Sequence, residues 1–368
     1  MNRLHIFNCS NDLALASNSQ AYIPPKNILL MEKELSSLPI WWADDGDAVL
    51  LQEKEHIAKV QDIANRIGKK LFFTTPQEGY HSLCHRCACK GFVAAPWGWS
   101  KDIARRLLSY GVPKESVPDK ERLEQLRGLS SKRYACEYIQ AFLSHNAIKE
   151  NRNLFVGEKM RYLQNIESLK ITETTILKSP WSSSGRGVFS ADSIESPSIR
   201  EKLSGFINRQ GGFIADKLYY KVLDFALEFS IEEGKAHFIG YSVFTAADNG
   251  YYGYNIVASQ EELKQMILDS GIDELLLQQC IDLHTLFLEK EISHFYNGYL
   301  GIDMLVADVD GCRKIHPCVE INLRMNLGIA SIFIYNATKG VECQLSPAVC
   351  KNFTAKIEDK KLILKQER

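Results

Sequence analysis

Apolar and polar residues follow two different periods along the first third of the chain. Short apolar runs at residues 4–7, 40–42, 49–51, 71–73 and 92–95 predict strands. Between them, apolar side chains recur on one helical face, most clearly over residues 56–67, and Ser100 stands where a helix over residues 101–108 needs an N-cap. This alternation predicts a mostly parallel sheet in an open α/β domain at residues 1–115.

The pattern changes in the second half, where strands follow one another. Residues 132–142 still predict a helix, with Ser130 and Ser131 as candidate caps. Residues 225–232 and 236–244 then alternate as strands around Glu233-Gly234, and a second hairpin joins residues 301–306 to 315–321 through Asp310-Gly311. We therefore expect an α+β region over residues 116–350, and a Lys-rich peripheral tail at residues 351–368.

Composition narrows the class of protein. A chain of 368 residues exceeds the size of one core, so two or three packed units are expected. The 44 Lys and Arg nearly balance the 45 Asp and Glu, which argues against nucleic acid as a partner. The first residues lack the pattern of a signal peptide, and no apolar run is long enough to cross a bilayer.

Ten cysteines are scattered without the spacing of a disulfide framework, which fits reduced thiols in the cytoplasm. Three of them, Cys84, Cys87 and Cys89, lie close together beside His81 and His85. The C-x2-C spacing of Cys84 and Cys87 is typical of a metal clip, but no second ligand pair follows along the chain. We favour incidental thiols over a metal site. The sequence leaves a homodimer open.

The second hairpin carries the clearest chemistry. Glu320, Asn322 and Arg324 alternate along one predicted strand, and Asp303 lies on its partner. Two carboxylates and an amide oxygen are ligands that Mg²⁺ accepts, with Mn²⁺ as an alternative, and an arginine can bind a phosphate in a fork. The competing interpretation is a solvent-facing strand with a Glu320–Arg324 salt bridge.

The stretch KSPWSSSGRGV, residues 178–188, favours the first interpretation. It follows a predicted strand and combines cations, hydroxyls and two glycines, Gly185 and Gly187, that permit close approach of the backbone to a ligand. The side chains that could contact phosphates are Lys178, Ser182, Ser183, Ser184 and Arg186. The stretch departs from the P-loop spacing, so we expect a phosphate-binding loop of another kind.

The lysines, the small-residue loop and the predicted metal ligands follow one another along residues 130–339 in an order that resembles the ATP-grasp superfamily of ligases. The resemblance implies that Lys132 and Lys178 bind the nucleotide phosphates, that residues 182–187 form a flexible loop over them, and that Asp303, Glu320 and Asn322 hold the metal. It also implies an adenine-binding hinge, placed at Asp216, Lys217, Leu218 and Tyr219, and an acidic residue near the ribose, placed at Glu228. Arg324 and Arg186 are then the catalytic cations. The serines stand where many members have glycines.

The resemblance implies an ATP-grasp fold of two α+β subdomains, residues 116–212 and 213–350, that enclose the nucleotide after an N-terminal parallel α/β domain. It implies a Mg-ATP-dependent ligase that activates a carboxylate as an acylphosphate for attack by an amine or a thiol. The alternatives are an ATP-dependent small-molecule kinase and an ATP-binding module without turnover.

The segment NCSNDLALA follows the first predicted strand, where open sheets bind ligands. Asn8, Asn11 and Asp12 are therefore candidate contacts to the substrate. A turn capped by its own Asn and Asp side chains explains the same residues equally well.

Overall fold

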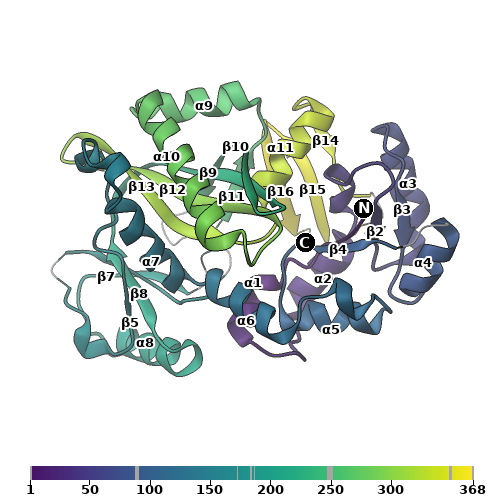
Figure 1. Ribbon diagram of the computed structural model, residues 1–368, viewed down its shortest axis with the longest axis horizontal. Helices are drawn as coiled ribbons and strands as arrows, with labels where there is room; N and C mark the ends of the chain where they lie inside the picture. The colour runs from purple at the N-terminus through teal and green to yellow at the C-terminus, as the bar shows by residue number, and fades with distance from the viewer. Residues whose placement is uncertain are drawn as a thin grey trace. The chain divides into compact units, whose positions relative to one another are not determined.

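The structure is a computed structural model that describes residues 2–87, 91–171, 173–182, 185, 187–246, 252–347 and 350–366 (Figure 1). The chain forms two compact units. Unit 1 comprises Met1–Gln125, Tyr254–Ser259 and Arg324–Arg368, and unit 2 comprises Leu126–Gly253 and Gln260–Leu323. The segment Arg324–Arg368 thus belongs to the first unit, whereas the sequence predicts a second domain that extends to residue 350.

Unit 1 contains the expected parallel sheet, in the order β3-β2-β1-β4. Its strands are β1 (Arg3–Ile6), β2 (Ala48–Leu50), β3 (Phe72–Thr74) and β4 (Val93–Pro96). The helices are α1 (Asn11–Ser17), α2 (Lys26–Glu34), α3 (Ile57–Arg66), α4 (Gly79–Cys87) and α5 (Lys101–Ser109), with short 3₁₀ helices η1 (Leu38–Trp41), η2 (Lys54–His56) and η3 (Lys114–Ser116). Helix α6 (Lys120–Leu129) crosses into unit 2. The α/β expectation for this region is confirmed.

Two local predictions for unit 1 have different outcomes. Ser100 caps α5 as expected, since its hydroxyl accepts the hydrogen bond of Ile103 N at 3.4 Å. The strand expected at residues 40–42 is wrong. Trp42 N instead donates to Pro39 O at 3.1 Å, so the run closes the 3₁₀ helix η1. All of η1 is buried, which is why its apolar run has the composition of a core strand.

The end of the chain is folded into unit 1 and is not a peripheral tail. Helix α11 (Leu327–Thr338) precedes β14 (Cys343–Gln344), β15 (Phe353–Glu358) and β16 (Lys361–Gln366), and β16 pairs with the end of β11 (Tyr252–Ile256). The Glu34 carboxylate at the end of α2 accepts from Asn352 N at 2.8 Å, Phe353 N at 2.7 Å and Asn352 Nδ2 at 2.5 Å. Burial opposes the charge, but these hydrogen bonds outweigh it and lower the pKa of Glu34.

Unit 2 begins with a four-stranded sheet in the order β5-β8-β6-β7, with α8 packed on one face (Figure 1). Its elements are β5 (Arg161–Leu163), β6 (Thr175–Lys178), β7 (Val188–Ala191), α8 (Pro197–Gln210) and β8 (Phe213–Lys217). Helix α7 (Lys132–Leu143) precedes them, with short turns η4 (Asn146–Ile148), η5 (Arg152–Leu154) and η6 (Ile166–Ser168). Ser131 caps α7 by accepting from Arg133 N at 3.1 Å.

The rest of unit 2 is built on antiparallel strands in the order β13-β12-β9-β10. They are β9 (Tyr220–Glu232), β10 (Lys235–Ala246), β12 (Gly298–Val309) and β13 (Cys312–Asn322), with α9 (Gln260–Asp269), α10 (Glu274–Phe287) and the π-helical turn η7 (Leu288–Ile292) between β11 and β12. Both predicted hairpins form. Glu233-Gly234 and Asp310-Gly311 adopt positive φ (51° and 81°, 54° and 80°), as the tight turns of twisted hairpins require.

Among the described residues, no helix is both long and apolar enough to cross a bilayer.

His284 of α10 is a buried histidine in the core of unit 2 and is fully inaccessible to solvent. Its ring stacks on Tyr138 of α7 with centroids 5.7 Å apart, and His284 Nδ1 lies 2.8 Å from the Tyr138 hydroxyl. Burial lowers the pKa of His284 from 6.5 to about 3.

We expect acid to destabilise the fold through His284. Below pH ~6.5 the unfolded chain takes up a proton that the buried imidazole refuses, so the free energy of unfolding falls as the pH drops from ~6.5 to ~3. Between pH 7 and pH 5 this residue alone should remove about 2 kcal/mol. Urea unfolding followed by circular dichroism at both pH values measures the loss.

His284→Gln should reduce that pH dependence, although it also lowers stability at pH 7 by disturbing the contact with Tyr138. His237, an exposed residue of β10, is the matched control, and His237→Gln should keep the wild-type pH dependence. An unchanged difference between pH 7 and pH 5 in His284→Gln would contradict the assignment.

Candidate functional site

All three predicted metal ligands project from one face of the antiparallel sheet in unit 2. Asp303 of β12 pairs directly with Glu320 of β13, and Gly301 pairs with Asn322. Residues two apart on a strand share a face, and directly opposed residues share it too. Asp303, Glu320 and Asn322 therefore project from the same face. Gly301 also pairs with Glu228 of β9, which extends this polar face to a third strand.

Glu228 is the most deeply buried acid of this face, at 1 % exposure. Ser242 of β10 donates its hydroxyl proton to Glu228 Oε1 at 2.7 Å, and Ser242 is itself buried. A buried carboxylate needs such hydrogen bonds to remain charged. The assignment of Glu228 to the ribose stays a prediction.

Lys132 contacts the acidic face directly. It is the first residue of α7, and its Nζ donates to Glu320 Oε1 at 2.6 Å and to Ser182 Oγ at 3.0 Å. The Lys132 side chain is only 5 % exposed. Lys132, Ser182 and Glu320, which are far apart in the sequence, thus meet at one ammonium group.

Lys178 ends strand β6 and is buried at 5 % exposure. The following loop returns to β7 through Ser179 N, which donates to Gly187 O at 2.9 Å. Gly187 has φ 77°, and a Cβ there would lie 2.5 Å from Ser179 Oγ, so the loop requires glycine at this position. Three predicted loop residues, Ser183, Ser184 and Arg186, lie outside the described residues.

Trp181 anchors the start of this loop by packing. Its indole nitrogen donates to Arg127 O at 3.0 Å, and the Arg127 guanidinium lies 3.6 Å from the ring centroid. Trp181 N donates to Gln210 Oε1 at 2.8 Å. These contacts hold the residues just before the serines against α6 and α8.

Asp216, in the predicted hinge at residues 216–219, forms a buried pair with His316 that the sequence does not predict. Asp216 Oδ2 lies 3.1 Å from His316 Nε2, and the two side chains are 3 % and 1 % exposed. Tyr219 packs its ring edge-on against His316 and accepts a hydrogen bond from Gly157 N at 3.1 Å. His316 is one of nine histidines and no local motif marks it, because its partner is 100 residues away.

The other hinge residues point elsewhere. Lys217 Nζ pairs with Glu173 at 2.9 Å, and Leu218 is 41 % exposed while its backbone N donates to Thr174 O at 3.0 Å.

Two buried thiols, Cys136 of α7 and Cys318 of β13, lie near the acidic face. Burial raises the pKa of Cys318 well above its usual value, with Cys136, Asp303 and Glu320 adding to the effect and Lys178 opposing it. Such thiols are chemically inert.

The residues fit a magnesium ion better than a softer metal. Within the described ranges, no group of three or more His, Cys, Asp and Glu side chains could hold a metal ion. Asp303, Glu320 and Asn322 instead offer two carboxylates and an amide oxygen, the hard donors that Mg²⁺ accepts. Glu320 already accepts a cation, the Lys132 ammonium.

The cysteine cluster lies elsewhere: Cys84 and Cys87 pack against the core of unit 1, and Cys89 lies outside the described residues.

Unit 1 has its own polar cluster where β1 and β4 end. The chain runs from β1 to β2 and β3 on one side and returns to β4 on the other, so ligands are expected at the carboxyl ends of β1 and β4. Asn8 Nδ2 donates to Gly98 O at 2.8 Å. With its amide nitrogen turned to the same loop, Asn11 donates to the carbonyls of Gly98 at 3.0 Å and Trp99 at 3.2 Å.

Asp12 holds Arg324 in a bidentate ion pair within unit 1. Arg324 Nε donates to Asp12 Oδ1 and Arg324 Nη2 to Asp12 Oδ2, each at 2.7 Å. Strand β13 ends at Asn322, so Arg324 does not continue the strand face of Glu320 and Asn322 as expected. The reason is that the chain leaves the ladder there, and Met325 N donates to Trp97 O at 2.8 Å.

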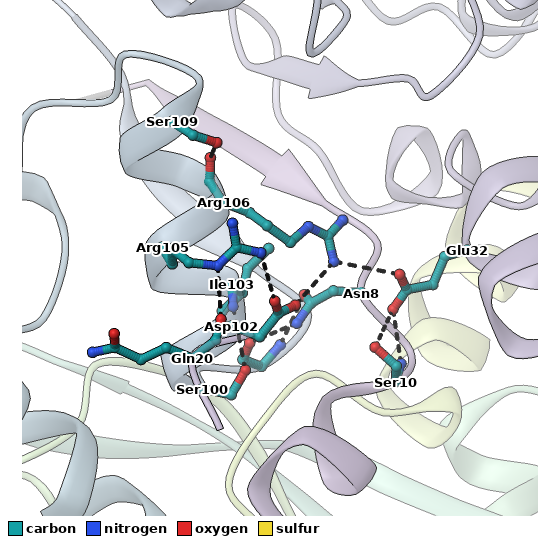
Figure 2. A network of polar contacts seen from close by, with 11 residues as sticks. Asn8, Ser10, Gln20, Glu32, Ser100, Asp102, Ile103, Arg105, Arg106 and Ser109 are labelled. Atoms are coloured by element: carbon teal, nitrogen blue, oxygen red, sulfur yellow. Dashed lines mark hydrogen bonds and ion pairs between the residues drawn. The ribbon is translucent and has the colours of Figure 1, made fainter. Parts of the chain in front are cut away.

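A network of charged side chains joins the loop after β1 to helices α2 and α5 (Figure 2). Glu32 Oε1 accepts from Ser10 N at 2.9 Å and from the Ser10 hydroxyl at 2.6 Å. Arg106 Nη1 bridges Glu32 Oε2 at 3.5 Å and Asp102 Oδ2 at 3.4 Å (Figure 2). Burial opposes the charge, but Glu32, Tyr110 and Asp102 together raise the pKa of Arg106. The network ties α5 to the loop after β1.

Solved structures with a similar fold are found, but no sequence comparison gives a match. No family model and no curated protein matches the sequence. A biotin carboxylase from Campylobacter jejuni is 13 % identical, with 92 % of this chain and 71 % of that chain covered and a TM-score of 0.51. A pyruvate carboxylase from Rhizobium etli is 11 % identical, with 90 % of this chain but 27 % of that chain covered and a TM-score of 0.51.

Biotin carboxylase is an ATP-grasp enzyme, and the resemblance noted in the sequence is confirmed at the level of the fold. The parallel sheet of unit 1 and the two sheets of unit 2 are the parts that this architecture requires. The chain therefore has the ATP-grasp fold.

Proposed function

We propose that this protein is a Mg-ATP-dependent ligase that activates a carboxylate as an acylphosphate, which an amine, or less often a thiol, then attacks. The observation that carries the proposal is the pairing of Asp303 with Glu320, with Lys132 bound to Glu320 at 2.6 Å. Two carboxylates side by side repel each other and serve no purpose on a sheet unless cations lie between them.

The chain's own residues divide the work of phosphoryl transfer. Lys132 and Lys178 bind the phosphates of ATP, together with the hydroxyl of Ser182, which contacts Lys132 Nζ at 3.0 Å. Asp303, Glu320 and Asn322 would hold Mg²⁺, which neutralises the phosphate oxygens when it is bound. The hinge, residues 216–219, offers its backbone to the adenine, and Glu228 lies toward the ribose.

The reaction needs no protein nucleophile. An oxygen of the substrate carboxylate attacks the γ-phosphorus, the bond to the β–γ bridging oxygen breaks, and ADP leaves. The amine then attacks the acyl carbon, phosphate leaves with the electron pair of the C–O bond, and the amine's proton passes to solvent. Arg324 is proposed to stabilise the transferred group, and Asp12 holds its guanidinium in one orientation.

We also propose that the carboxylate substrate binds in unit 1, at the carboxyl ends of β1 and β4. Asn8 and Asn11 hold the two loops together there, and Asp12 with Arg324 forms a charged pair whose side chains remain 14 % and 17 % exposed. Partial exposure beside a rigid backbone is what a substrate contact requires.

Removal of either predicted metal-binding carboxylate should abolish turnover. Asp303→Asn and Glu320→Gln should each lower kcat by roughly 100-fold or more, since a metal ligand contributes several kcal/mol to the transition state. The measurement is ADP release with Mg-ATP, screened over amino acids, dipeptides and amines. Asp308→Asn, the same change at the far end of β12, is the control and should retain activity. Near-full activity in both site variants would refute the metal assignment.

The same screen separates the alternatives. A kinase would release ADP without any amine and leave a stable phosphorylated product. A binding module would show a rise in melting temperature with ATP but no consumption. A ligase requires a carboxylate substrate together with an amine or a thiol, and its product contains the new amide or thioester.

Asp12→Asn should weaken the binding of the carboxylate substrate without affecting ATP. We expect KM for that substrate to rise about tenfold or more, because the Arg324 guanidinium loses the charged partner that orients it, and KM for ATP to change by less than about twofold. Asp62→Asn, an exposed position on α3 of the same unit, is the control. Equal effects on both KM values would place Asp12 outside the substrate site.

A further inference from the structure

Lys132 occupies an unusual position for a residue expected to bind phosphates. Its ammonium donates hydrogen bonds to Glu320 Oε1 at 2.6 Å and to the Ser182 hydroxyl at 3.0 Å. Its backbone N donates to Pro180 O at 2.9 Å, which fixes the start of α7 next to the same loop. The ammonium therefore lies directly on a predicted metal ligand.

This contact and a divalent cation exclude each other in part. Mg²⁺ binds carboxylate oxygens at short distance, and a second cation on the same carboxylate is repelled strongly where water is scarce. The Lys132 side chain is 5 % exposed and that of Glu320 is 25 % exposed, so solvent screens the repulsion poorly. Lys132 thus competes with the metal for Glu320.

A triphosphate changes the balance, because its oxygens offer the ammonium a second anionic partner. We propose that Lys132 sets the order of binding: it blocks Glu320 to divalent cations in the free protein, and the nucleotide phosphates draw it away and open the metal site. This inference rests on the proposed function, because it takes Glu320 to be a metal ligand. It makes Lys132 a residue that couples the two ligands as well as a phosphate contact.

The proposal predicts effects of opposite sign on two ligands. Lys132→Met removes the competitor, so Mn²⁺ should bind the nucleotide-free protein about tenfold more tightly, while ATP without metal should bind about tenfold more weakly. The electron paramagnetic resonance signal of free Mn²⁺ measures the first affinity, and isothermal titration calorimetry the second. Lys132→Gln is expected to behave in the same way and serves if Lys132→Met does not fold.

Two controls separate competition from a change in net charge or in packing. Lys132→Arg keeps the cation and should bind Mn²⁺ within about twofold of wild type. Lys221→Met removes a positive charge from β9, where Lys221 pairs with Asp224 at 2.6 Å, and should also remain within about twofold. A purely structural Lys132–Glu320 pair predicts weaker or unchanged Mn²⁺ binding in Lys132→Met, and that result would overturn the proposal.

A second comparison distinguishes this failure from failure of the proposed function. Glu320→Gln in the Lys132→Met background should abolish the gain in Mn²⁺ affinity. If Mn²⁺ binds the double variant as tightly as it binds Lys132→Met, Glu320 is not a ligand and both ideas fail. If Glu320→Gln alone weakens the binding of Mn²⁺ with ATP but Lys132→Met gives no gain, the metal site stands and only the order of binding is wrong.

Discussion

The side-by-side placement of Asp303 and Glu320 is the constraint on which the chemistry of unit 2 depends. The register of the β12–β13 hairpin forces it, and two carboxylates so placed need a cation. In the structure the first residue of α7 supplies that cation through Lys132. Two hydrogen bonds of Lys132 tie the start of α7 to the residues after β6: its Nζ donates to Ser182 Oγ, and its backbone N donates to Pro180 O.

Unit 1 depends on a different set of interactions, which join segments far apart in the sequence. Asp12 binds Arg324, and Glu34 binds the backbone at Asn352 and Phe353, so the end of the chain packs on its beginning. In the Glu32–Arg106–Asp102 network beside the loop after β1, the two carboxylates are buried, the Arg106 side chain is 17 % exposed, and hydrogen bonds join all three residues. A rigid support of this kind keeps the ends of β1 and β4 in place, which is what a substrate site at a sheet edge requires.

Patterns that depend on neighbours in the sequence predicted the structure well. The Glu233-Gly234 and Asp310-Gly311 turns form because positive φ is inexpensive there, and Ser100 and Ser131 cap helices through hydrogen bonds to the next turn. The errors arose where burial overrode local pattern. Residues 40–42 are apolar enough for a strand but close a 3₁₀ helix around Pro39, and residues 353–366 look polar because β15 and β16 bury only alternate side chains. Their register is set by strands that the local sequence does not reveal.

The sequence by itself determined the alternation of strands and helices and the two hairpins, because each depends on residues a few positions apart. It also carried the resemblance to ATP-grasp ligases, through the order of residues between Lys132 and Arg324 along the chain. The tight turn fixes the register of β12 and β13 only as far as Leu305. A shift between Asp303 and Leu305 then brings Asp303 opposite Glu320, and no local pattern reveals that shift. Only the tertiary structure decided which partners the charged residues have. Lys132 meets Glu320 across 188 positions, Asp216 meets His316 across 100, and Asp12 meets Arg324 across 312. Such pairs depend on how whole elements pack, and no local period or propensity encodes that packing.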